Sequence, residues 1–145
     1  MKNNINNIVW FLGLLVVVGL LVFFPNQEKD PITFKDAMNQ AFPAEQDYPK
    51  MIVVDGTGQG EKATEVKNPE VIAELLEIAG AMMLVPSVDL PSSDYRIELY
   101  LNETDYIGHM ITISERRNLI LIGGSAYNVV SDNLLLEELK KSLLN

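Results

Sequence analysis

The sequence predicts an α+β protein: an N-terminal transmembrane helix, then a small antiparallel sheet of about five strands with helices packed on one face. Three observations predict this fold class. Residues 5–24 form an uncharged apolar run, helical and strand-like patterns follow one another over 50–145, and short turns join the most regular strands. The expected organisation is a signal anchor over 1–25, a stalk with a short amphipathic helix over 26–49, and an exported domain over 50–145.

The apolar run over 5–24 has the length of a membrane span, because about 20 helical residues cross a bilayer core of roughly 30 Å. Trp10 suits an interfacial anchor, and Pro25 ends the run. A cleaved signal peptide is the alternative, but the small residues of a cleavage site are absent before Pro25. Lys2 precedes the run, so the sequence predicts a single-pass protein of the cell membrane with a cytoplasmic N-terminus and an extracytoplasmic C-terminal domain.

Composition excludes several classes of function. The formal net charge is −9, from 11 Lys plus Arg against 20 Asp plus Glu, and such a field repels phosphate backbones. We therefore expect no nucleic-acid partner. The chain has no cysteine, which excludes disulfides, thiolate metal sites and cysteine nucleophiles. His109 is the only histidine, and no serine lies in a nucleophile-elbow pattern.

A short helix is expected between Thr33 and Pro43, within the segment that precedes the predicted domain. Thr33 with Asp36 resembles a capping box, and the apolar residues of this helix recur at helical spacing: Phe34, Ala37, Met38, Ala41 and Phe42. Two strands over 51–54 and 62–66 follow, joined by a glycine-rich loop.

A second helix is expected to begin at Asn68, an N-cap residue that precedes Pro69. Its buried face is Val71, Ile72, Leu75, Leu76 and Ala79, and Gly80 is its expected end. Residues 85–94, which contain two prolines, are expected to form a loop.

The C-terminal half predicts an antiparallel meander of strands over 95–101, 107–113 and 119–122, joined by polar turns. Ser131 and Asp132 are expected to cap a final helix. Its apolar surface is Leu134, Leu135, Leu136, Leu139 and Leu143, and Lys140 and Lys141 suit its C-terminal end.

The stretch from Asp55 to Thr64 has two possible functional interpretations: a phosphate-binding loop and a calcium loop. A phosphate-binding loop needs a lysine where Glu61 stands, and it must open into a helix rather than a strand. A calcium loop of the EF-hand type matches at Asp55 and Gly60 but has Val66 where a bidentate glutamate is required. We therefore expect no nucleotide.

An irregular calcium site using Asp55 and Glu61 stays an alternative for this loop. The simpler interpretation is a flexible connection between two strands, in which the glycines adopt positive φ. If this loop has a function, we expect contact with a partner rather than catalysis.

Other candidate residues have structural explanations. His109 lies among isoleucines and is expected to be a partly buried sheet residue rather than a ligand. Glu103 and Asp105 lie in a turn, where solvation is the simplest interpretation, although Asn102 begins a glycosylation acceptor pattern. Gly123-Gly124-Ser125 lacks the second glycine of a lipase motif and predicts a bulge or close turn. We expect no catalytic residue, no cofactor and no metal.

The stretches Asn68–Ala79, Tyr95–Leu101 and Leu119–Tyr127, with the leucine-rich helix that follows, resemble small uncharacterised membrane-anchored exported domains of Gram-positive bacteria. The resemblance covers most of residues 50–144. Such domains are not associated with an activity, so the resemblance implies an anchored exported domain and no catalytic residue.

The leading functional hypothesis is a membrane-anchored envelope protein whose acidic domain binds a protein or peptide partner in an accessory or regulatory role. Its partners would be the membrane, through residues 5–24, and another envelope or membrane protein. Two alternatives stay open: an envelope hydrolase with two converging carboxylates, and a small-ligand sensor with a pocket near Tyr100 or Tyr127.

Overall fold

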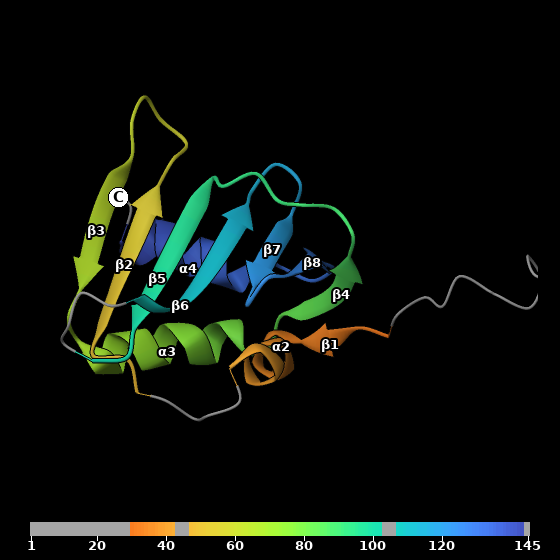
Figure 1. The fold of residues 1–145 in the computed structure, drawn as a ribbon, viewed down its shortest axis with the longest axis horizontal. Coiled ribbons are helices and arrows are strands. Elements are labelled where there is room, and N and C mark those ends of the chain that lie inside the picture. Colours follow the sequence, from red (N-terminus) through yellow and green to blue (C-terminus); the bar gives the residue numbers. More distant parts are fainter. Residues whose placement is uncertain (1–29, 43–46, 103–106, 144–145) are drawn as a thin grey trace, which may run out of the picture.

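The computed structural model describes residues 30–42, 47–102 and 107–143. In these residues one sheet holds eight strands in the order β1-β4-β8-β7-β6-β5-β2-β3, and every neighbouring pair is antiparallel (Figure 1). The strands are β1 (Ile32–Thr33), β2 (Lys50–Asp55), β3 (Lys62–Val66), β4 (Met83–Ser87), β5 (Tyr95–Tyr100), β6 (Ile107–Ser114), β7 (Leu119–Ile122) and β8 (Ser125–Val129). The helices are α2 (Phe34–Ala41), α3 (Pro69–Ala79) and α4 (Leu134–Ser142).

The predicted fold class, about five strands with helices packed on one face behind a transmembrane helix, is wrong. The described chain is a sheet-dominated fold of eight strands with three helices. The additional strands are β1, β4 and β8. β1 has only two residues, too few for a periodic pattern, and β8 buries only Tyr127 and Val129 strongly.

β4 was not predicted as a strand, because Pro86 is typical of a loop. The Val130 N–H donates to the Met83 carbonyl, so the backbone of Met83, Val85 and Ser87 faces β8. Pro86 then faces the outer edge, where its missing N–H removes no bond of the β4–β8 ladder. A proline is therefore compatible with this strand.

The predicted membrane span needs a separate correction. Among the residues that the structure describes, no helix is both long and apolar enough to cross a membrane. The longest of their helices, α3, has 11 residues, whereas a span needs about 20. The single-pass localisation and the membrane keywords that depended on the span are thus not supported. The run over 5–24 lies outside the described residues.

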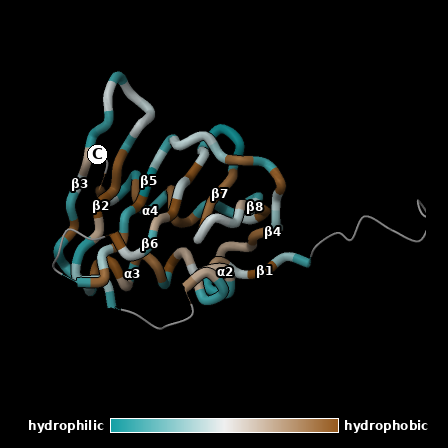
Figure 2. The backbone as a smooth tube through the Cα atoms, in the orientation of Figure 1, coloured by the Kyte–Doolittle hydropathy of each residue, from teal (hydrophilic) through white to brown (hydrophobic). Residues whose placement is uncertain are grey.

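The interior lies between the sheet and the three helices. Alternate residues of the central strands are fully buried there, among them Met51, Val53, Ile97, Leu99, Ile111, Ile113, Ile120 and Ile122. The helices contribute Phe34 and Ala37 from α2, Ile72, Leu75 and Ala79 from α3, and Leu135 and Leu139 from α4. Figure 2 shows the contrast between the apolar β2 and the paler, hydrophilic loop that joins it to β3. The short amphipathic helix expected within 26–49 is α2, and it supplies core residues.

The close turn between β7 and β8 brings the sheet against α2. Gly123 and Gly124 both have positive φ (56° and 86°), and Ile122 pairs with Ser125 across them. A Cβ added to Gly123 would lie 2.5 Å from the Cβ of Ala41, so only glycine fits there. This contact fixes the position of α2 on the sheet.

Candidate functional site

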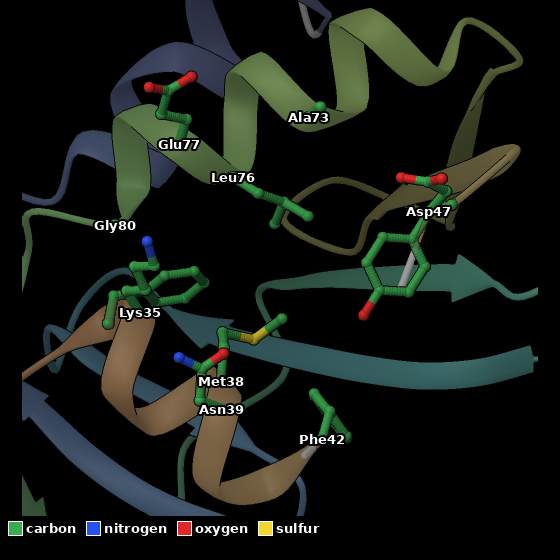
Figure 3. A pocket seen from close by; sticks show the side chains of 11 residues that line it. Lys35, Met38, Asn39, Phe42, Asp47, Ala73, Leu76, Glu77 and Gly80 are labelled. Carbon is green, nitrogen blue, oxygen red and sulfur yellow. The ribbon is translucent and has the colours of Figure 1, made fainter. Parts of the chain in front are cut away.

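A groove with a volume of about 540 Å³ lies between α2 and α3. We call it the α2–α3 groove. Figure 3 shows Leu76 of α3 pointing across it toward Met38 of α2. The residues that line the groove are Phe34, Lys35, Met38, Asn39, Phe42, Asp47, Tyr48, Ala73, Leu76, Glu77 and Gly80.

One wall is α2, which begins after Thr33. The Thr33 hydroxyl oxygen accepts a hydrogen bond from the backbone N–H of Asp36 at 3.0 Å, so the helix start is capped. Because the helix has only eight residues, its position depends on its packing. Phe34 anchors it in the core, and Met38 and Phe42, partly buried, face the groove.

The other wall is α3, which the Asn68 side chain caps by accepting from the Glu70 N–H at 2.9 Å. The first stripe of this helix, Ile72, Leu75 and Ala79, enters the core. A second stripe at i, i+3, i+4 and i+7 lines the groove: Ala73, Leu76, Glu77 and Gly80. The helix therefore uses two adjacent surfaces, one for stability and one that borders the groove.

An aromatic cluster forms one end of the groove. The Tyr48 Oη lies 3.0 Å from His109 Nδ1, and the Phe42 ring stacks on the imidazole with 3.7 Å between ring centroids. Burial lowers the pKa of His109 and raises the pKa of Tyr48, because both charged forms lose solvation there. Both groups are therefore neutral near pH 7, and the phenol O–H can donate to an Nδ1 that carries no proton. His109 thus supports two residues of the groove wall.

The charged and amide side chains that line the groove are exposed, and we place them at its rim. Lys35, Asn39, Asp47 and Glu77 are exposed, whereas Phe34 and Tyr48 are buried. The Tyr48 hydroxyl already has a partner in His109. The groove therefore has an apolar interior with one cation and two carboxylates around it. Further along α3, Glu70 and Glu74 are also exposed.

A second hollow of about 360 Å³ lies beside β4 and β8 and includes Tyr127 in its lining. It is the hollow nearest to the Tyr127 pocket predicted for a small ligand. Val88 and Leu90 border it but are 95% and 74% exposed, so it is shallow on that side. Tyr100, the other predicted pocket residue, lines neither hollow.

The glycine-rich loop carries its own internal contacts. The Asp55 carboxylate accepts from the N–H and the hydroxyl of Thr57, at 2.9 and 2.7 Å, and these bonds lower its pKa. Glu61 lies 3.6 Å from Arg96, so the two proposed calcium ligands have different partners. No group of three or more metal-binding side chains occurs within the described ranges. The loop ends at Gly60, whose φ is 108°.

The remaining sequence candidates are Glu103, Asp105 and Ser125. Glu103 and Asp105 lie outside the described residues. Ser125 is exposed beside the β7–β8 turn. Among the candidates that lie in the described residues, only His109 contacts the groove lining, where it supports Phe42 and Tyr48.

No family model, curated protein or solved structure matches this chain. The resemblance to exported domains of Gram-positive bacteria therefore stays a prediction, and the function must be argued from the geometry of the site.

Proposed function

We propose that this domain is a binding module that holds a peptide segment of a protein partner in the α2–α3 groove, in an accessory or regulatory role. The observation that carries the proposal is the apolar interior of the groove between two helices, with charged side chains at its rim. Partner segments commonly bind such grooves by placing apolar anchor residues between the helices.

The location of the polar groups favours a peptide over a small polar ligand. A small-molecule site needs polar groups placed inside the cavity to fix the ligand. Here the exposed polar side chains stand at the rim, and the hydroxyl of the buried Tyr48 is engaged by His109. An apolar side chain of a peptide would fill the interior of the groove, and the polar groups of the peptide would stay at the rim.

The charge around the groove specifies the peptide further. Asp47 and Glu77 outnumber Lys35 at the rim, and Glu70 and Glu74 extend the negative surface along α3. Opposite charge across an interface favours association and selects partners. We therefore propose a peptide with a large apolar or aromatic anchor flanked by Lys or Arg.

The test is selection from a library of random short peptides displayed on phage, with the full chain as bait. The expected result is enrichment of peptides that combine a large apolar residue with neighbouring basic residues. Ala73→Arg places bulk and positive charge in the groove at an exposed helical position, so it should weaken binding of the enriched peptides by about tenfold or more, roughly 1.4 kcal/mol.

Val71→Arg is the matched control, because Val71 is exposed on the same helix and does not line the groove. This variant should bind the enriched peptides like the wild type. Enrichment of acidic peptides, or equal affinity of the Ala73→Arg variant and the wild type, would refute the proposal. Circular dichroism confirms that both variants are folded.

A further inference from the structure

The edge of the sheet at β3 has consequences for how this protein could assemble. β3 is the last strand in the sheet order and pairs only with β2 (Figure 1). Among the described residues no strand lies beyond it, and its five residues include no proline. The opposite edge differs, since β1 covers part of β4 and Pro86 interrupts the remainder. An edge strand with open backbone groups is a template for pairing with another strand.

The register with β2 decides which way the side chains of β3 point. Val66 is opposite Met51 and Thr64 is opposite Val53, and both β2 residues are fully buried. Lys62, Thr64 and Val66 therefore lie on the face toward the core. Ala63 and Glu65 lie on the other face. By continued alternation so do Glu61 and Lys67, which flank the strand and are exposed.

We propose that β3 pairs antiparallel with β3 of a second copy of this chain, around a two-fold axis at Thr64. This register pairs all five residues of the strand with those of the partner, and Thr64 lies opposite Thr64 of the partner subunit. It also places Glu61 opposite Lys67 of the partner subunit, and symmetry repeats this pair at the other end. Opposite charges and paired threonines are both favourable neighbours across strands.

Alternative registers are worse for electrostatic or packing reasons. A slip of one residue would exchange the two faces of the partner strand and break the continuity of the core side. A slip of two residues in one direction sets Glu61 opposite Glu65 of the partner subunit. In the other direction it sets Glu65 opposite Glu65 of the partner subunit. Charge complementarity therefore selects both the occupant and the register.

Analytical ultracentrifugation of the full chain over a range of concentrations tests the proposal by charge reversal. The wild type should show a concentration-dependent dimer. Glu61→Lys sets lysine opposite lysine at both ends of the pairing, and Lys67→Glu sets glutamate opposite glutamate. Each variant alone should raise the dissociation constant by about tenfold or more, because like charges opposite each other oppose pairing.

Mixing the two variants should restore association, because each end of the mixed dimer then carries one lysine and one glutamate. The double variant should also associate like the wild type. Intrachain effects cannot imitate this rescue. The ion pairs of Glu61 with Arg96 and of Lys67 with Glu65 stay broken in the mixture. Six residues of extended chain also separate positions 61 and 67 by roughly 20 Å.

Glu137→Lys, at an exposed position of α4, is the control for a change in net charge and should leave association unchanged. A wild type that is monomeric at every concentration would overturn the proposal, as would a mixture that associates no better than the single variants. Because β3 is not part of the groove lining, a failure here is distinguishable from a failure of peptide binding.

Discussion

The Tyr48 hydroxyl lies 3.0 Å from Nδ1 of His109, and this contact joins residues 61 positions apart in the sequence. The histidine also stacks on Phe42. The two residues that it contacts belong to the wall of the α2–α3 groove. A neutral imidazole at the sheet therefore holds the aromatic end of the groove in place.

This relationship predicts a pH dependence of stability. Burial lowers the pKa of His109 in the folded state below its unfolded value of about 6.5, so the unfolded chain takes up the proton first as pH falls. The contribution of the neutral His109 imidazole to the free energy of unfolding is fully present above about pH 6.5. It is lost as pH falls through the folded pKa of His109. Denaturant unfolding from pH 7.5 down to pH 5 should show falling stability, and His109→Gln should reduce that slope.

The imidazole can be observed directly, since His109 is the only histidine of the chain. Its ring proton resonance should titrate below the ordinary histidine pKa of about 6.5. Titration at or above that value, or an unchanged slope in the His109→Gln variant, would show that the imidazole is not held neutral by burial.

The loop between β2 and β3 predicts different outcomes for two of its glycines. Gly60 has a φ of 108°, so Gly60→Ala should destabilise the protein by about 1–3 kcal/mol through backbone strain. Gly58 has no positive φ and no atom within 4 Å of an added Cβ. Gly58→Ala should therefore be neutral or slightly stabilising. Equal effects of the two substitutions on the free energy of unfolding would contradict the loop geometry.

The core predicts a large effect at Ile97 of β5, whose side chain is fully buried. Ile97→Ala should lower the free energy of unfolding by about 2–5 kcal/mol, because it removes buried methyl groups and leaves a cavity. Val88→Ala is the control at a position that is 95% exposed, with an expected change within about 0.5 kcal/mol. If Ile97→Ala lowered the free energy of unfolding no more than Val88→Ala does, Ile97 would not belong to the core.

Local signals in the sequence predicted the described helices and the five strands whose apolar residues follow a recognisable pattern. Asn68 before Pro69 indicated the start of α3, and alternation from Tyr95 indicated β5. The missing strands lack such signals. β1 is too short to show a pattern, and β4 contains Pro86, which is typical of a loop. β8 follows the glycine pair, which indicated only a turn. The pairing of β4 with β1 and with β8 depends on contacts distant in sequence, such as Leu84 with Val129.

The candidate site was less accessible from the sequence than the fold. Two signals were available: the apolar face of α2 with Met38 and Phe42, and the second stripe of Ala73, Leu76 and Glu77 beside the core stripe of α3. Leu76 was predicted to be buried in the core, whereas it also faces the groove. Tyr48 and His109 could not be paired in advance, because their contact joins residues 61 positions apart in the sequence.

Nuclear magnetic resonance can show whether the α2–α3 groove holds a basic peptide with an apolar anchor. The strongest peptide from the library selection is titrated into the isotope-labelled full chain. We expect the largest backbone amide shifts at the facing surfaces of the two helices: Lys35, Met38, Asn39, Ala73, Leu76 and Glu77. Largest shifts along β3 or around Tyr127, with these residues unchanged, would contradict this expectation.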